Sequence, residues 1–243
     1  ESGAHITIEG GTYKSNGTKP VLYAEGAWTS GGTTYPPATM EIIGGNFQGT
    51  IFATKAASSD PGTLTIYGGT FSSAVDPKYC ADGFVPQDNG GGSYGVKSLF
   101  TSGTGTEQDP FVITSEDDLN ALQDSVAGGA SYTGKYFELK NNIALSDVWT
   151  PIGSQDKPFS GIFDGGGNTI SGMTITAASG YTGFFGSLSG AQVKDLTIAD
   201  ADITCADDAW VGVLAGRANS STITGCSVSG EIKMTDPVVN GTA

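Results

Sequence analysis

A nine-residue motif that occurs three times constrains the fold more than any other feature of this sequence. Its copies are HITIEGGTY at 5–13, TMEIIGGNF at 39–47 and TLTIYGGTF at 63–71. Each copy alternates apolar and polar residues, as expected of a strand with one buried face, and then places an aromatic residue after a Gly-Gly pair. Because glycine adopts positive φ at little cost, the pair predicts a bend between two short strands.

One copy of the motif is too short to bury its own apolar side chains, whereas stacked copies cover one another. Aligning the glycine pairs superposes Ile8 with Ile42 and Ile66, and Tyr13 with the phenylalanines of the other two copies. The unequal spacing favours a coil whose strands keep register while one loop varies in length. Parallel strands joined by crossovers are almost always right-handed. We therefore expect an all-β fold: a right-handed parallel β-helix (solenoid) with one short capping α-helix.

The second half of the chain carries a related pattern with different residues. ISGMTI at 170–175, VKDLTI at 193–198 and ITGCSV at 223–228 superpose at offsets of 23 and 30 residues. A second apolar element precedes each stretch, and within it Phe185 and Ala215 are also 30 residues apart. Two strands that keep step along a chain are typical of stacked coils. The side chains expected to point inward are Ile170, Met173, Ile175, Val193, Leu196, Ile198, Ile223, Cys226 and Val228.

The change of pattern between the two halves predicts two segments. The first, 1–97, is expected to be a β-solenoid segment that ends in a hairpin at 82–96, where short apolar stretches flank a Gly-rich turn. The second, 98–243, is expected to be a β-helix segment with a capping α-helix near 115–127.

The expected helix has a polar start and one apolar face. Ser115 is a suitable N-cap. Leu119, Leu122 and Val126 form one face, which we expect to cover the open end of the second segment. Three acids follow Ser115, and they favour a helix start, where the dipole is positive, over a calcium site. These acids are Glu116, Asp117 and Asp118.

Charge and composition exclude several classes of function. The formal charge is −14, from 25 acidic against 11 basic residues, and Arg217 is the only arginine. Such a chain cannot build the basic face that nucleic acid requires, and no apolar run approaches the roughly 18 residues of a membrane span. Three cysteines, Cys80, Cys205 and Cys226, are too few and too scattered for a disulfide scaffold or a zinc site, and an odd number leaves at least one thiol free. Small buried residues are their expected role. We expect no metal and no cofactor.

Several stretches between 104 and 232 resemble a known family. In chain order they are GTGTEQDPFVITSEDDLNAL, YFELKNNIAL, WTPIG, PFSGIFDGGGNTISGMTI, GFFGSLSGAQVKDLTI and VGVLAGRANSSTITGCSVSG. Together they are similar to the GLUG-motif parallel β-helix region of large bacterial cell-surface proteins, although VGVLAG stands where that family usually has a Gly-Leu-Val-Gly run. The first segment is similar, more loosely, to the Gly-Gly-Thr-Phe repeat tails of secreted gut Firmicutes proteins. The resemblance implies a secreted or cell-surface, adhesin-like bacterial protein, with no shared catalytic residues.

Parallel β-helices also include enzymes that cleave polysaccharides, and these place carboxylates in one groove together with calcium or a basic residue. The candidates here are Asp164, Asp200, Asp202, Asp207 and Asp208, with Arg217 one coil further on. Asp200 and Asp202 would point the same way on a straight strand. His5, the only histidine, has no supporting motif and is expected to be an exposed strand residue. Because acids on solenoid loops are usually solvated, a lyase or glycosidase is the alternative hypothesis.

Tryptophans in the loops favour binding over catalysis. Trp28 shares the loop 25–39 with Tyr35, while Trp149 and Trp210 lie in later loops. A loop tryptophan stacks on a sugar ring, anchors a protein partner or folds back over the core. We expect Trp149 in the core, because WTPIG alternates like a buried strand. Trp28, Tyr35 and Trp210 are the candidate ligand-binding residues.

The main hypothesis is therefore a non-enzymatic bacterial module, at the cell surface or secreted, that binds a host glycoprotein, a glycan or a secreted immunoglobulin. A solenoid suits this role, since it offers a long rigid surface with variable loops along one edge. The hypothesis includes no contact with nucleic acid and no insertion into a membrane. A passive structural stalk is the third alternative.

Overall fold

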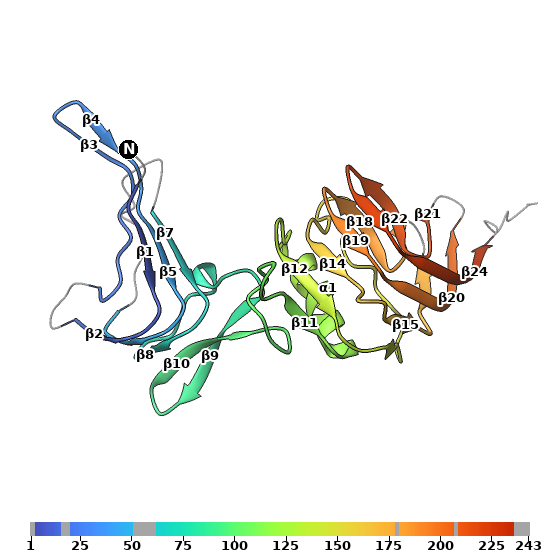
Figure 1. Cartoon of the computed structure of the whole chain (residues 1–243), viewed down its shortest axis with the longest axis horizontal. Coiled ribbons are helices and arrows are strands. Elements are labelled where there is room, and N and C mark those ends of the chain that lie inside the picture. The colour runs from blue at the N-terminus through green and yellow to red at the C-terminus, as the bar shows by residue number, and fades with distance from the viewer. Residues whose placement is uncertain (1–2, 16–19, 51–61, 178–179, 207–208, 236–243) are drawn as a thin grey trace, which may run out of the picture. The chain divides into compact units, whose positions relative to one another are not determined.

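The computed structural model describes residues 3–15, 20–50, 62–177, 180–206 and 209–235. The chain divides into two compact units, Glu1–Ser98 and Leu99–Ala243. Regular structure in the described residues is nearly all β, most of it parallel, with one α-helix in the second unit (Figure 1).

The first unit consists of short strands in two parallel ladders and two hairpins. One ladder has the order β1-β5-β7, and the other has the order β2-β6-β8-β10-β9, in which β10 is antiparallel to both of its neighbours, β8 and β9. Figure 1 shows β1, β5 and β7 side by side. The strands are β1 (His5–Ile8), β2 (Thr12–Lys14), β3 (Trp28–Ser30), β4 (Thr33–Tyr35), β5 (Thr39–Ile42), β6 (Asn46–Gln48), β7 (Thr63–Ile66), β8 (Thr70–Phe71), β9 (Phe84–Gly90) and β10 (Ser93–Ser98), with a 3-10 turn η1 (Pro77–Tyr79).

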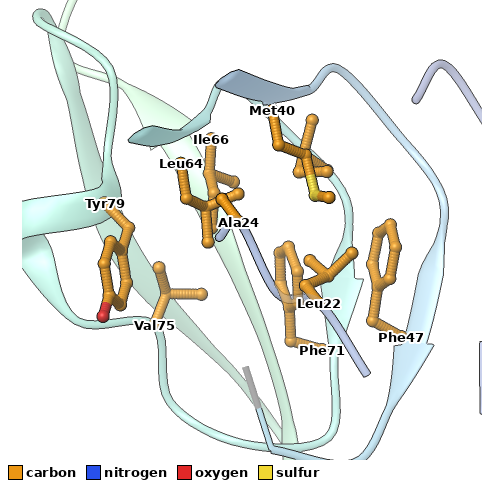
Figure 2. Packing of buried hydrophobic residues seen from close by; sticks show 10 residues of the cluster. Leu22, Ala24, Met40, Phe47, Leu64, Ile66, Phe71, Val75 and Tyr79 are labelled. Carbon is orange, nitrogen blue, oxygen red and sulfur yellow. The ribbon is translucent and has the colours of Figure 1, made fainter. Parts of the chain in front are cut away.

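The register of these ladders confirms the alignment of the three motif copies. Ile8 is paired with Ile42, which is paired with Ile66. The aromatic rings after the glycines form a column, with 5.1 Å between the centroids of Tyr13 and Phe47 and 5.1 Å between those of Phe47 and Phe71. Figure 2 shows how the buried side chains of the two ladders meet residues of the segment before β3 in one core. That core contains Leu22, Ala24, Met40, Ile42, Phe47, Leu64, Ile66, Phe71, Val75 and Tyr79.

The structure explains why each copy needs two glycines. Gly69 has a φ of +110°, which strains any residue with a side chain. A Cβ on Gly68 would lie 2.4 Å from the Ile43 carbonyl oxygen of the preceding copy. In the first copy, a Cβ on Gly10 would meet nothing within 4 Å. The first glycine is therefore required by the neighbouring strand and the second by the bend.

The two ends of the first unit differ in how they are covered. The hairpin β9–β10 pairs antiparallel with β8 and completes that ladder, which confirms the hairpin expected at 82–96. At the other end, Ile6 is 43% exposed, whereas its register partner Met40 is 8% exposed. No described strand lies beyond β1, so its apolar side chains lack the cover that each later strand receives from its neighbour.

The second unit consists of two longer ladders and two further pairs of parallel strands. One parallel ladder has the order β11-β12-β14-β19-β23, and a second has the order β13-β15-β20-β16, with β24 also paired to β20. Two further parallel pairs are β17-β21 and β18-β22. The elements are β11 (Phe111–Ile113), α1 (Glu116–Gly128), β12 (Tyr136–Leu139), β13 (Ile143–Ala144), β14 (Ile162–Asp164), β15 (Thr169–Ser171), β16 (Thr174–Ala177), β17 (Tyr181–Thr182), β18 (Phe185–Ser189), β19 (Gln192–Lys194), β20 (Thr197–Ala206), β21 (Trp210–Val211), β22 (Ala215–Asn219), β23 (Thr222–Thr224) and β24 (Ser227–Thr235).

One of the two sequence offsets in this unit is confirmed and the other is wrong. Val193 is paired with Ile223 and Phe185 with Ala215, as the offset of 30 predicts. The offset of 23, which aligned Ile170 with Val193, fails because Ile170 is paired with Ile198 instead. Several strands of this unit share a similar apolar alternation, and the alignment matched a strand of one ladder, β15, to a strand of the other, β19.

The last coil also differs from expectation in its burial. Val193 and Ile198 are buried, but their partners Ile223 and Val228 are 41% and 49% exposed, although both were expected to point inward into a core. Cys226 is half-buried. No described strand lies beyond β23 and β24, so the apolar side chains of these two strands have no neighbouring strand to cover them.

Helix α1 begins and ends within one residue of the predicted range. Ser115 is its N-cap and forms a capping box with Asp118, while Gly129 ends it in the left-handed conformation. Leu119, Leu122 and Val126 are fully buried, as the apolar face predicted. The acids serve the helix start, and the Glu116 carboxylate accepts hydrogen bonds from the amide and hydroxyl of Ser146, just beyond β13. These hydrogen bonds tie the first turn of α1 to the segment that follows β13.

Asp118 is the most strongly hydrogen-bonded of the three acids. Burial pushes its pKa upward, but hydrogen bonds from the Thr114 amide and from the hydroxyls of Thr101, Ser115 and Thr114 outweigh burial, so the pKa of Asp118 lies below its usual value. The charged form is therefore the one that the fold stabilises.

Trp149 lies in the core, as expected. It is 3% exposed, its ring stacks on Phe184 at 5.1 Å, and its indole N–H donates to the Phe184 carbonyl oxygen over 3.0 Å. The three cysteines form no disulfide with one another, and Cys205 is buried. Burial, followed by the charge of Asp76, raises the pKa of the Cys80 thiol to about 11. Among the described residues, no helix has the length and apolar character needed to cross a bilayer.

Candidate binding surface

Trp210 lies on the surface of the second unit against the ring of Tyr181. The two residues are register partners on the parallel strands β17 and β21. Their ring centroids are 6.0 Å apart and the planes are perpendicular, at 89°. Trp210 is 65% exposed, so the contact with Tyr181 leaves most of the indole surface open.

Arg217 joins these two aromatic residues from strand β22. Its Nη1 donates a hydrogen bond of 2.8 Å to the Tyr181 hydroxyl, and its Cζ lies 5.4 Å from the centroid of the same ring. Cations held over an aromatic face are attracted by the negative potential of the ring. We refer to Tyr181, Trp210 and Arg217 together as the Trp210 platform.

Close backbone approach brings β22 to this position. A Cβ on Gly216 would lie 2.4 Å from the Thr182 amide nitrogen and 2.6 Å from the Trp210 carbonyl oxygen. Glycine is therefore the residue that fits between β17 and β21 at this point. Since Arg217 follows directly, the same packing that requires glycine places the guanidinium beside Tyr181.

The platform combines two kinds of recognition. An exposed indole offers a flat apolar face for the C–H groups of a sugar ring or for an apolar side chain. A guanidinium offers planar, forked donors that match carboxylate and sulfate-like groups. Arg217 is exposed, and among the described residues no carboxylate forms an ion pair with it.

The other two candidate residues belong to a hairpin of the first unit. Trp28 and Tyr35 are register partners across β3 and β4, whose turn is made by Gly31 and Gly32 with φ of +58° and +81°. The hairpin projects from the ladders of its unit (Figure 1), and Tyr35 is 39% exposed. The side chain of Trp28 lies outside the described residues. Trp28 and Tyr35 thus come together, while Trp210 belongs to the other unit.

The carboxylates considered for catalysis are placed separately. Asp202 pairs with Lys233 at 3.1 Å, and Asp164 pairs with Lys194 at 2.8 Å. Asp200 has a φ of +55°, at a register shift in β20, so the straight strand expected to align it with Asp202 is wrong. Asp207 and Asp208 lie outside the described residues. Arg217, expected beside these acids, contacts Tyr181 instead.

The only histidine, His5, lies on strand β1. His5 is an exposed strand residue, as expected, and its Nε2 lies 3.7 Å from the Glu41 carboxylate. Within the described ranges, no cluster of three or more His, Cys, Asp or Glu residues has the geometry to hold a metal ion.

A hollow of about 320 Å³ lies between α1 and the segment before β14. Gln123 and Ala127 line it from the helix, and the Lys157 ammonium donates to the Ala127 carbonyl oxygen at its edge. The remaining lining residues are Thr150, Pro151, Gly153, Ser154 and Asp156. No feature of the sequence had indicated this hollow.

Sequence reasoning identified Trp210 but missed Tyr181. The 30-residue offset between Phe185 and Ala215, carried back along both strands, places Tyr181 beside Val211. The observed register pairs Tyr181 with Trp210 itself. The signal was therefore present in the sequence, one residue out of step.

Comparison with known proteins gives partial matches. Halomucin of Haloquadratum walsbyi is 36% identical over 123 residues, which are 47% of this chain and 1% of halomucin. A putative Gly-rich membrane protein of Evansella cellulosilytica is 30% identical over 130 residues, which are 49% of this chain and 14% of that protein. The chain thus spans a small share of each relative. No family model matches the chain, and neither does any solved structure.

Proposed function

We propose that the chain is a non-enzymatic binding module of a bacterial protein that is secreted or displayed at the cell surface. Its ligand in this proposal is a host glycoprotein, a glycan or a secreted immunoglobulin. The observation that carries the proposal is the exposed indole of Trp210, held on Tyr181 beside an exposed guanidinium. A large aromatic side chain with most of its surface open is common at the centre of binding sites.

The proposal includes a right-handed parallel β-helix for each unit, of the GLUG type in the second. The in-register parallel pairing of successive strands supports it, since Phe111, Phe137, Phe163 and Val193 follow one another in a single ladder. Right-handedness follows from the strong preference of parallel crossovers. Such a scaffold holds surface side chains rigidly, which lowers the entropic cost of binding.

The relatives support the assignment to a cell surface. One is named a Gly-rich membrane protein, and this chain is itself rich in glycine, with 38 of 243 residues. The other is named a halomucin. The chain carries a net charge of −14, and high net charge keeps exposed repeat proteins soluble and apart.

The proposal is tested by screening the chain against a glycan array, mucin and secretory immunoglobulin, with Trp210→Ala as the variant. Tyr23→Ala, at an exposed tyrosine of the other unit that is not a candidate ligand-binding residue, is the aromatic control. We expect at least one class to bind and Trp210→Ala to weaken that binding by at least tenfold, because truncating a central aromatic anchor typically costs about 2 kcal/mol or more. Binding to none of these classes would favour the passive stalk.

A further inference from the structure

We propose that the Trp210 platform selects acidic saccharides, meaning sugars that carry a carboxylate or a sulfate, and that Arg217 recognises the acidic group. This inference rests on the binding function proposed above and names its ligand class.

Tyr181 is the residue that holds the two recognition groups together. Its ring packs perpendicular to that of Trp210, and its hydroxyl accepts the hydrogen bond from Arg217 Nη1 over 2.8 Å. A guanidinium has five N–H donors, and the bond to Tyr181 uses one of them. The remaining donors are available for the two oxygens of a carboxylate or sulfate in a forked arrangement.

The distribution of charge favours an anion at this place. Four lysines are paired with carboxylates of the same chain, whereas Arg217 contacts a tyrosine and, among the described residues, no acid. These lysines are Lys78, Lys140, Lys194 and Lys233. Arg217 is also the only arginine in a chain whose net charge is −14. The platform therefore offers a cation that no described carboxylate neutralises, in a chain whose net charge is strongly negative.

The acidic surface limits which anions can use this site. Long-range repulsion works against any anion, although at physiological salt it is screened beyond roughly 8 Å. Short-range contact must supply the affinity, and the open face of Trp210 can do so by stacking on the sugar ring. A ligand that has both a ring and an acid gains from both groups, whereas a free anion gains from one.

The test compares each acidic saccharide with its neutral counterpart on the whole chain by calorimetry. The pairs are 3′-sialyllactose with lactose, for a carboxylate, and galactose 6-sulfate with galactose, for a sulfate. We expect the wild-type chain to bind the acidic member of at least one pair more tightly. Arg217→Gln should weaken that binding by about 10- to 100-fold, the usual effect of one charge-assisted contact, and leave binding of the neutral member unchanged.

Three further measurements separate recognition of the acid from folding. Tyr181→Phe keeps the ring but releases Arg217, so we expect a smaller loss than with Arg217→Gln. Lys14→Gln removes an exposed cation of the first unit and should change nothing. In 1 M NaCl the preference for the acidic member should shrink, because salt screens exposed charges. Thermal midpoints equal to that of the wild-type chain show that the variants fold.

Each contrary result has a distinct meaning. If the acidic and neutral members bind equally, and Trp210→Ala weakens this binding whereas Arg217→Gln does not, the proposed selection of acidic saccharides is wrong. The proposed binding module would then still hold. Binding that neither variant alters would overturn both proposals for this surface. Binding of an acidic peptide but of no saccharide would overturn the ligand class proposed here.

Discussion

Ile203 and Ile232 provide a matched test of how the second unit is stabilised. The two isoleucines are register partners on β20 and β24 and have the same chemistry. Ile203 is fully buried, whereas Ile232 is 40% exposed. Replacing each with alanine removes the same atoms from an inner coil and from the last described coil, so any difference in cost reports on the cover that a neighbouring coil supplies.

The expected magnitudes follow from burial. Isoleucine to alanine removes three carbons, worth about 2.4 kcal/mol at about 0.8 kcal/mol for each buried carbon. The cavity left at Ile203 adds to this, so we expect Ile203→Ala to lower the free energy of unfolding by about 3.5 kcal/mol, within the usual range of about 2–5. Ile232 is partly exposed and encloses no cavity, so we expect Ile232→Ala to cost at most about 1.4 kcal/mol.

The assay is urea unfolding followed by tryptophan fluorescence, in which the buried Trp149 reports on the second unit. A difference of about 2 kcal/mol between the two variants is the expected result. Equal costs would show that something covers Ile232 as fully as Ile203. Small costs for both would show that Ile203 is not in a packed core, and the stacking argument would then be wrong.

Three further predictions concern a glycine, an acid and a thiol. Gly68→Ala should lower the thermal midpoint, because its Cβ would lie 2.4 Å from a carbonyl oxygen, whereas Gly10→Ala, which meets nothing within 4 Å, should not; equal shifts would contradict the register. Asp118→Asn should reduce the free energy of unfolding at pH 7 by about 2 kcal/mol, while the exposed Asp117→Asn should change it little. Folding lowers the pKa of Asp118, so the stability that its charged form contributes is present above the unfolded pKa of about 3.9 and is lost as the pH falls through the folded pKa. In urea titrations at acidic pH, the free energies of unfolding of Asp118→Asn and Asp117→Asn should therefore converge. Cys80, with its pKa raised to about 11, should react with iodoacetamide at pH 8 about 100-fold more slowly in the folded chain than in urea, and labelling at equal rates would contradict its burial.

The fold of the first unit was largely predictable from the sequence. Each Gly-Gly pair marks one position in every copy, so the alignment placed Ile8, Ile42 and Ile66 in the register that the structure has. Glycine at a position of positive φ is a strong marker, because few other residues adopt that conformation. The helix was equally clear, since Ser115 and the apolar face defined its start and its buried side.

The second unit was harder to predict because its strands lack such a marker. The left-handed residue after β19 is Asp195, whereas the one after β23 is Gly225, so the same bend is made by different residues. Apolar alternation alone fits more than one side of a coil, which explains why Ile170 was aligned with Val193 rather than with Ile198. Burial of Ile223 was also overestimated, because a periodic pattern does not show where the stack of strands ends.

The candidate binding surface could be predicted only in part. A tryptophan in a polar loop was enough to select Trp210. Its neighbours Tyr181 and Arg217 lie on other strands, β17 and β22, and the pairing of the strands brings them together. Arg217 was noted as the only arginine and was expected beside the candidate carboxylates, whereas it contacts Tyr181. The direction in which a residue points depends on bends in the backbone, such as the one at Asp200. Side-chain contacts between coils therefore needed the structure.

The account depends most on parallel, in-register stacking, and methyl NOE spectroscopy of the isoleucine-labelled chain tests this directly. Neighbouring coils are about 4.8 Å apart, so register partners should give strong methyl cross-peaks. We expect Ile175 to show a cross-peak to Ile203 and Ile203 to Ile232, with none between Ile175 and Ile232, and a separate cross-peak between Ile42 and Ile66. Absence of these cross-peaks, together with the close Hα–Hα contacts of antiparallel strands at the same residues, would contradict it.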